Sequence, residues 1–278
     1  MANKKYLQGR ATELVAHFAA LTPPVFTVSE AAAYLGLTSP AATSMLGDLV
    51  SRGWIVRHRS GVFEIAPLWA TPDAPYQPDR FAALTEWVRE PYYVAFQSAC
   101  EIRDWTEHPV RNRLWIAVPR TYRWTPTTAR DRITFVEMAP NRFTWGITKH
   151  WVGERAVPIS DPERTILDCL HLPRHGGDIS EVARVLRRAW SDLDNSRLLD
   201  HADLLGIDAV RRRLGFLIEV LNLPNGESVT SGLREQMSHA RRSPVLLDPD
   251  LPVDGPVDRA WRVRVNVDRV ELAEAGQT

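Results

Sequence analysis

Hydroxyl-bearing and basic side chains gather at two nearby places between residues 38 and 60. The first place opens an expected helix, and the second is a turn between two expected strands. Hydroxyl groups exchange hydrogen bonds with base edges and phosphates, while guanidinium groups pair with phosphate oxygens. These residue types therefore suit contacts to DNA. The residues that we expect to make such contacts are Thr38, Ser39, Thr43, Ser44, Arg57, His58, Arg59 and Ser60.

Two short helices and a hairpin must position these side chains. Apolar residues recur at helical spacing in 27–36 and again in 38–53, and both segments end at a glycine. Strand-like runs at 54–56 and 62–65 then flank the basic turn. We expect the helix caps to be Thr27 or Ser29 and then Thr38 or Ser39. This order predicts a winged helix-turn-helix whose second helix reads DNA, although such modules also bind proteins.

Three carboxylates lie close together in the segment 160–170, where a strand-like run gives way to a helical period. Asp161, Glu163 and Asp168 are residue types that bind metal ions or transfer protons. However, Asp161 and Asp168 are about two helical turns apart, roughly 10 Å along the axis, which is too far for one site. We therefore interpret the block as structural. Either Ser160 with Glu163, or Asp161 itself, caps the helix, and Arg164 pairs with Asp168.

Arginines cluster on two later helices. Arg187 and Arg188 fall in the expected helix 179–190, and Arg211, Arg212 and Arg213 fall in 207–221. Because the opposite faces of both helices are apolar, we expect these arginines at or near the surface. They form either a solvated face or a second phosphate-binding surface made of Arg187, Arg188, Arg211 and Arg212.

Overall charge excludes proteins that bind nucleic acid through bulk charge alone. The 278 residues carry 34 basic and 34 acidic side chains, a formal net charge of zero. Residues 1–70 have only a small excess of basic side chains. Tight DNA binding would therefore need a homodimer, the second basic surface, or both.

Motifs typical of enzymes are missing from the sequence. It holds no phosphate-binding G-x-x-x-x-G-K-[ST] loop, no G-x-S-x-G elbow and no H-E-x-x-H helix. His171 and His175, next to Gly176 and Gly177, could line a small anion site, but loop histidines more often cap a helix end. We expect no catalytic residue, no cofactor and no metal ion. Cys100 and Cys169 are expected to be buried free thiols.

Expected elements divide the chain into a winged helix-turn-helix at 1–68, a Pro-rich linker at 69–78 and a second domain at 79–278. The expected strands of the second domain are 114–118, 133–136, 143–147, 156–159 and 261–267, and its expected helices are 79–89, 98–105, 162–170, 179–190, 196–205, 207–221 and 228–240. The fold class is therefore α+β, with a small mixed sheet followed by a helical bundle. No apolar run could cross a bilayer and no signal-type block is found, so we expect a cytoplasmic protein without membrane contacts.

The order of these pieces resembles the AbiEi-type antitoxins of bacterial abortive-infection and type IV toxin–antitoxin systems. The resemblance covers about Thr12 to Leu221. It is carried by the R-x-R-x-G-V-F hairpin 57–63, by Tyr92-Tyr93-Val94 with Ser98 and Ala99, by the block 160–170, by Gly176-Gly177 and by the segment 212–219.

The resemblance implies a DNA-binding antitoxin of a phage-defence system. Its N-terminal domain would bind an inverted repeat in the promoter of its own operon and repress it. Its C-terminal domain would neutralise a nucleotidyltransferase-like toxin, without the need for a stable complex. Two alternatives stay open: a winged-helix regulator whose C-terminal domain senses a small ligand, and an enzyme, for example a kinase, that modifies the toxin.

Overall fold

The computed structural model describes residues 7–70, 74–88, 91–110, 112–121, 132–237, 243–268 and Leu272. Contacts divide the chain into two compact units. Unit 1 comprises Met1–Pro91, Arg123–Arg132 and Lys149–Val157, and unit 2 comprises Tyr92–Tyr122, Ile133–Thr148 and Pro158–Thr278. The predicted boundaries at 68, 69–78 and 79 stay a prediction.

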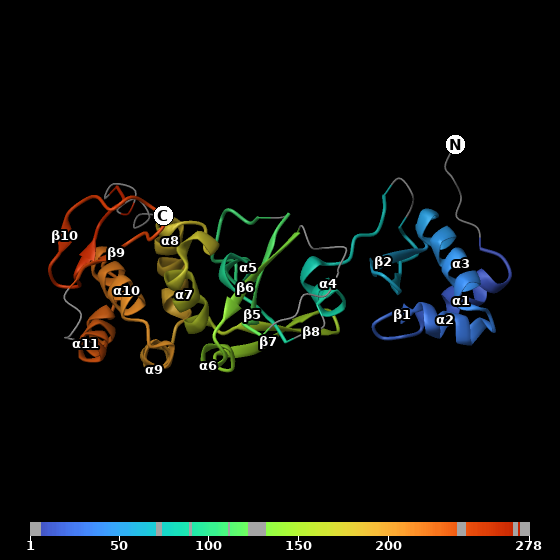
Figure 1. The fold of residues 1–278 in the computed structure, drawn as a ribbon, viewed down its shortest axis with the longest axis horizontal. Coiled ribbons are helices and arrows are strands. Elements are labelled where there is room, and N and C mark those ends of the chain that lie inside the picture. Colours follow the sequence, from blue (N-terminus) through green and yellow to red (C-terminus); the bar gives the residue numbers. More distant parts are fainter. Residues whose placement is uncertain are drawn as a thin grey trace. The chain divides into compact units, whose positions relative to one another are not determined.

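Unit 1 begins with three helices and a small sheet (Figure 1). The elements are α1 (Arg10–Ala19), β1 (Val25–Thr27), α2 (Val28–Leu35), α3 (Ser39–Ser51), β2 (Ile55–Arg59) and β3 (Val62–Ile65). The strands pair antiparallel in the order β1-β3-β2. Phe18 stacks on Phe26, and both pack with Leu46 and Leu49 in one core. The predicted winged-helix arrangement is confirmed, with the three-residue strand β1 added.

Local capping explains the turn between α2 and α3. The Thr27 side chain accepts from the Glu30 backbone N–H, and the Glu30 carboxylate accepts from the Thr27 N–H at 2.7 Å, which completes a capping box. At the other end of α2, Gly36 adopts φ 60°, a left-handed conformation that glycine takes without strain. The chain can therefore reverse quickly and start α3, with Pro40 in its first turn.

Helix α4 (Arg80–Trp87) completes the described helices of unit 1. Its N-cap is Asp79, whose carboxylate accepts from the N–H groups of Phe81 and Ala82. The helix packs against β2 of the winged-helix sheet. The described residues of the predicted linker, between Ile65 and α4, form no helix or strand.

A five-stranded mixed sheet has the order β6-β5-β4-β8-β7. Its strands are β4 (Tyr93–Val94), β5 (Leu114–Pro119), β6 (Ile133–Met138), β7 (Ile147–Val152) and β8 (Arg155–Ser160). Strand β5 runs parallel to β6 and antiparallel to β4, and α5 (Phe96–Ile102) packs against β5. The prediction of a strand at 143–147 is wrong, because short helix α6 (Pro140–Phe143) and a turn at Gly146 with φ 64° occupy that segment.

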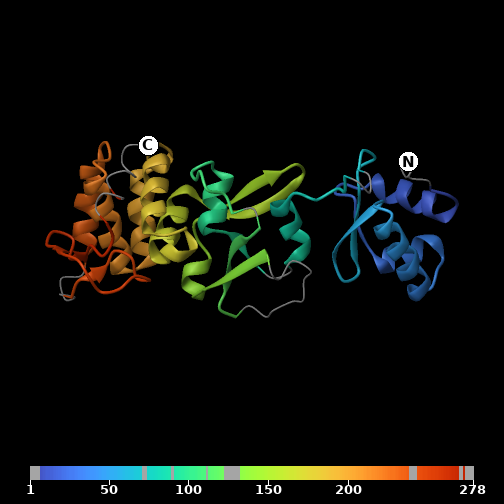
Figure 2. The same ribbon diagram turned by 90° about the horizontal axis from the view of Figure 1, so that it is seen from above.

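The chain after β8 is mainly helical, and Figure 2 shows these helices lying side by side in the yellow-to-red part of the chain. They are α7 (Pro162–His171), α8 (Ile179–Ala189), α9 (Asn195–Leu205), α10 (Asp208–Val220) and α11 (Gly226–Gln236), with single 3-10 turns at Pro173–His175 and Trp190–Asp192. A small sheet of β9 (Val245–Leu246), β10 (Val257–Asp258) and β11 (Val263–Arg264) closes the fold. The fully buried Trp261 fills the space above Gly215, where even a Cβ atom would lie 2.2 Å from the indole ring.

None of the helices in the described ranges is both long enough and apolar enough to cross a membrane.

Candidate nucleic-acid interface

The N-terminal half of α3 presents a face of small and hydroxyl-bearing side chains to solvent. Ser39, Ala41, Thr43 and Ser44 are exposed, while Ala42 points into the core. The Thr43 hydroxyl donates to the Ser39 carbonyl at 2.8 Å, so its oxygen lone pairs remain available as acceptors. This face is free of bulky side chains and can approach a groove closely.

The first turn of α3 is not capped as the sequence predicted. Thr38 occupies the N-cap position, but no side chain among the described residues accepts from the first backbone N–H groups of the helix. These N–H groups carry the positive end of the helix dipole, which favours a phosphate oxygen as partner. The uncapped start of α3 therefore adds an anion-binding element to its hydroxyl face.

The β2–β3 hairpin forms the wing, and its turn lies at Ser60-Gly61, with Gly61 at φ 74°. Arg57 is exposed, and its guanidinium lies over the Phe63 ring, 5.3 Å from the centroid. Arg59 is half-buried, and its Nε donates to the Glu86 carbonyl at 2.8 Å. Arg57 is thus better placed than Arg59 to reach a phosphate.

His58 was predicted to contact DNA with its neighbours, but the structure buries it to 1 % exposure. The register between β2 and β3 shifts between Arg57 and Arg59, so a bulge turns the intervening side chain inward. The imidazole Nε2 lies 2.6 Å from the Glu64 carboxylate. We therefore leave His58 out of the interface.

Glu64 is the centre of a buried polar network in unit 1. Besides His58, its carboxylate accepts from Arg155 at 2.9 Å and from the Tyr76 hydroxyl at 3.0 Å. Burial raises the pKa of Glu64, but the hydrogen bonds from His58 and Arg155 outweigh it, and the net pKa shift is downward. Burial and the nearby Glu64 charge raise the pKa of Tyr76 to about 12. The wing is therefore held by an ionised carboxylate whose partners come from three other segments.

Residues 13–66, which contain this interface, match the family described as "Transcriptional regulator, AbiEi antitoxin". The match covers this N-terminal region only, so it shows that residues 13–66 are similar to the AbiEi antitoxin regulators. A comparison with curated proteins gave no match. Among solved structures, the crystal structure of the RV2827C protein from Mycobacterium tuberculosis is similar over 100 % of this chain and 98 % of that chain, with a TM-score of 0.75 and 15 % identity. At that identity the likeness shows the fold, and it confirms the predicted α+β class along the whole chain.

The arginine cluster beyond the AbiEi-matched region does not form the second basic surface that the sequence suggested. Arg211, Arg212 and Arg213 are all buried, and Arg212 has an exposure of 0 %. Arg212 pairs with Asp208 at 2.7 Å, while Arg213 donates to the carbonyls of Leu246 and Leu170. These arginines instead join α10 to α7 and to the C-terminal segment.

Arg187 and Arg188 on α8 are half-buried and already engaged. Arg187 donates to the Leu221 carbonyl at 2.6 Å, and Arg188 pairs with Glu107. For Arg212, the sequence did hold a local signal of its ion pair, because Asp208 lies four residues before it.

The block 160–170 folds as capping and internal pairing predict. Asp161 is the N-cap of α7 and accepts from the Arg164 N–H at 2.8 Å, whereas Ser160 bonds to Thr165 rather than forming a capping box with Glu163. Arg164 and Asp168 are both fully buried, with Nε and Oδ1 2.7 Å apart. Burial opposes the charge on Arg164, but the Asp168 and Asp161 carboxylates raise its pKa above the ordinary value.

The two histidines near Gly176-Gly177 are poor candidates for acid–base chemistry. Burial lowers the pKa of His171 to about 4, and burial also lowers the pKa of His175. A side chain on Gly176 would collide with Val182 and Cys169, so this glycine serves close packing. Cys100 and Cys169 are buried free thiols, as expected, with their sulfurs 3.8 Å apart.

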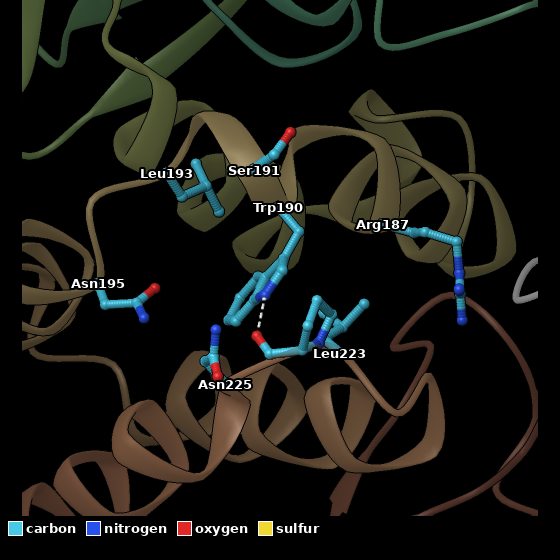
Figure 3. Close-up of a pocket in the computed structure, with 8 residues that line it drawn as sticks. Arg187, Trp190, Ser191, Leu193, Asn195, Leu223 and Asn225 are labelled. Atoms are coloured by element: carbon cyan, nitrogen blue, oxygen red, sulfur yellow. Dashed lines mark hydrogen bonds between the residues drawn. The ribbon is translucent and has the colours of Figure 1, made fainter.

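A hollow of about 480 Å³ lies between the end of α8 and the start of α11 (Figure 3). Trp190 forms its centre, and the indole N–H donates to the Pro224 carbonyl at 2.8 Å. The other lining residues are Arg187, Ser191, Leu193, Asn195, Leu223 and Asn225. Sequence reasoning did not find this hollow, because its walls come from segments that only tertiary packing brings together.

Proposed function

We propose that this protein is an antitoxin that binds double-stranded DNA at an inverted repeat in its own promoter and represses its toxin–antitoxin operon. The observation that carries the proposal is the exposed, uncapped N-terminal face of α3 inside the AbiEi-matched region. The interface comprises Thr38, Ser39, Thr43 and Ser44 on the helix with Arg57, Arg59 and Ser60 on the wing. In this arrangement the helix enters the major groove and the wing contacts backbone phosphates.

The modest charge of this interface favours a homodimer on the DNA. Of the two wing arginines, only Arg57 is exposed, whereas Arg59 is half-buried. Arg211 and Arg212 are buried and therefore supply no second phosphate-binding surface. An inverted repeat offers two equivalent half-sites, so a second copy of the chain doubles the number of phosphate contacts. Dimerisation on the operator thus provides affinity that one copy lacks.

Neutralisation of a nucleotidyltransferase-like toxin is assigned to unit 2, and this part of the proposal rests on the resemblance of residues 92–219 to AbiEi antitoxins. The toxin is neutralised in the cytoplasm without the need for a stable complex, and no catalytic residue or cofactor is assigned. The system would thereby act in phage defence and regulate its own synthesis.

Operator binding is tested by fluorescence anisotropy with the full chain. A duplex containing the inverted repeat upstream of the gene is compared with a scrambled duplex of equal length over a series of salt concentrations. We expect tighter binding to the repeat and a linear loss of log affinity with log salt concentration. Equal binding to both duplexes, or no binding at low salt, would contradict the proposal.

Substitutions on the wing and on the helix are expected to act differently. Arg57→Ala should weaken binding to both duplexes by a similar factor and reduce the salt slope by about one. Thr43→Ala should instead reduce the preference for the repeat over the scrambled duplex. Arg52→Ala, at the far end of α3, is the control and should leave both quantities close to those of the unaltered protein. An equal loss on both duplexes from Arg57→Ala and Thr43→Ala would show that α3 is not the reading helix.

The two activities are expected to separate in cells. A promoter–reporter fusion measures repression, and growth during toxin expression measures neutralisation. Arg57→Ala should release the reporter while growth rescue stays intact, because the substitution lies in unit 1. If Arg57→Ala abolished both repression and growth rescue at normal protein levels, the assignment of the two activities to separate units would be contradicted.

The hollow around Trp190 supports a second candidate function, a winged-helix regulator that senses a small ligand. An aromatic wall with nearby amide groups from Asn195 and Asn225 is typical of small-molecule sites. The neighbouring gene distinguishes the two functions. A gene for a nucleotidyltransferase-like toxin favours the antitoxin, and a metabolic operon favours the ligand sensor.

A further inference from the structure

Three potential metal ligands converge where the N-terminus of α7 meets α9 in unit 2. They are Asp161, the N-cap of α7, Glu163 in the first turn of α7, and His201 on α9. Each offers one ligand atom, and these atoms all lie within 4.8 Å of one another. The sequence grouped Asp161 and Glu163 with Asp168, but Asp168 is occupied by Arg164, and His201 takes the third place.

Two of the three residues, Glu163 and His201, each have a buried polar atom without a hydrogen bond among the described residues. Glu163 has 0 % exposure; its Oε1 accepts from the Asp194 N–H at 2.7 Å, but its Oε2 has no hydrogen-bond partner among the described residues. Arg197 Nη1 lies 3.7 Å from that oxygen, on a side chain that is 53 % exposed. Buried carboxylate oxygens normally accept a hydrogen bond or bind a cation, so an oxygen without a hydrogen bond at this position requires an explanation.

His201 has the same deficiency. Its side chain is nine-tenths buried, and in the part of the chain that the structure describes its Nδ1 has no hydrogen-bond partner. The nearest carboxylate oxygen, Asp161 Oδ1, lies 3.6 Å away, beyond hydrogen-bond distance. An imidazole nitrogen and a carboxylate oxygen that are both buried and both without a hydrogen bond in one cluster are suited to bind a cation.

The surrounding contacts hold all three side chains in place. Asp161 is fixed by its bond from the Arg164 N–H, and its own N–H donates to the Gly146 carbonyl at 2.8 Å. Glu163 is anchored by Asp194, and the His201 ring packs against Trp145 with centroids 5.0 Å apart. Partners outside the first shell of a metal orient its ligands in this way.

We propose that Asp161, Glu163 and His201 bind one divalent first-row transition-metal ion, with Zn²⁺ as the best fit. Two carboxylates and one imidazole suit Zn²⁺ better than Mg²⁺, which prefers an octahedron of oxygen ligands and water. The ion replaces the weak contact from Arg197 and neutralises the carboxylates. Because Zn²⁺ is usually four-coordinate, three protein ligands would leave one position for water or another ligand.

Only small movements are needed to close the site. Ligand atoms about 2.1 Å from Zn²⁺ in a tetrahedron lie roughly 3.4 Å from one another. Since the ligand atoms lie within 4.8 Å of one another, each pair has to approach by at most about 1.4 Å to reach this spacing. Bound metal would tie α7 to α9 and to the Asp194 loop, which stabilises unit 2 independently of the proposed DNA binding.

The test uses full-length protein freed of metal with a chelator and then dialysed. Isothermal titration with Zn²⁺ should show one equivalent bound, and thermal unfolding should shift upward in proportion to the logarithm of free metal. Glu163→Gln keeps an oxygen for the Asp194 N–H but removes the second carboxylate oxygen, so it should weaken Zn²⁺ binding about 100-fold. Glu235→Gln, an exposed glutamate on α11, is the matched control and should bind as the unaltered protein does.

A second set of measurements tests whether weaker binding results from misfolding and whether cysteines bind the metal instead. Asp161→Asn retains a capping oxygen, and His201→Gln removes the imidazole; each should weaken binding as Glu163→Gln does, while Arg197→Gln should strengthen it. Co²⁺ bound at the site should give a visible spectrum without sulfur charge transfer, which distinguishes the site from Cys100 and Cys169. Unchanged affinity in the folded ligand variants, or a sulfur-to-cobalt band, would overturn the proposal.

Discussion

Asp168→Ala is expected to lower the free energy of unfolding of unit 2 by about 3–5 kcal/mol, because it leaves the buried Arg164 charge without its carboxylate partner. The corresponding fall in melting temperature is roughly 10 °C. Circular dichroism during heating and urea unfolding measure the two quantities. This is the largest single-residue effect on stability that we expect from the charged groups of unit 2.

The surroundings of Arg164 explain the size of the effect. Its Nη2 also donates to the Tyr93 hydroxyl at 2.8 Å and to the Arg142 carbonyl, and its guanidinium lies over the Trp145 ring at 3.9 Å. These contacts keep the cation in place after Asp168 is removed, yet none of them supplies a negative charge. Burial also raises the pKa of Tyr93 well above its ordinary value, so the phenol does not ionise to compensate.

A matched ion pair on the surface provides the control. Asp48 and Arg52 have the same i,i+4 spacing on α3, but both side chains are largely exposed. Asp48→Ala should therefore cost at most about 1 kcal/mol. An Asp168→Ala protein with an unchanged melting temperature but lost toxin neutralisation would instead show that the carboxylate acts in function.

Sequence patterns predicted the elements whose causes are local. The Thr27–Glu30 capping box, the left-handed Gly36 and the Asp161 cap each depend on residues within four positions of one another. The winged helix and the helices from α7 to α11 could therefore be found from spacing alone. Strands β4, β9 and β10 are two residues long and have no period to detect, so only their pairing in the folded chain defines them.

Burial of charge was harder to predict, because the partners are distant in sequence. Arg212 and Arg213 lie in a basic run of α10, but in the folded chain they donate to the carbonyls of Ser243 and Leu246 in the C-terminal segment. His201 lies on α9 and Glu163 on α7, so their proximity also depends on tertiary packing and has no local sequence signal. In the candidate interface on α3 and the wing, the burial of His58 could not be predicted, because its inward turn depends on a bulge in β2.

Glu64→Gln is expected to destabilise unit 1 by about 3 kcal/mol, because it leaves the buried His58 and the largely buried Arg155 without a carboxylate. The glutamine amide retains one acceptor oxygen, but its NH₂ group takes the place of the second oxygen and cannot accept a hydrogen bond from His58, Arg155 or Tyr76. Since Glu64 lies on the strand that returns from the wing, DNA binding should weaken along with stability. Urea unfolding and the anisotropy assay measure both effects, and Glu13→Gln on the exposed face of α1 is the control.

The pH dependence of stability gives a sharper test of the same network. The pKa of Glu64 is lower in the folded protein than in the unfolded chain, so folding favours the ionised form. Its contribution is fully present above the ordinary glutamate pKa and is lost as the pH falls through the lowered pKa of the folded state. His58, Arg155 and Tyr76 are the groups that face this carboxylate.

Unfolding free energies measured from neutral to acid pH should therefore fall less steeply for Glu64→Gln than for the unaltered protein, and the two curves should converge at low pH. Glu13→Gln should follow the unaltered protein throughout. If Glu64→Gln instead runs parallel to the unaltered protein over the whole range, the carboxylate is not ionised by its partners, and the wing is held by packing of Phe63 against Phe26 alone.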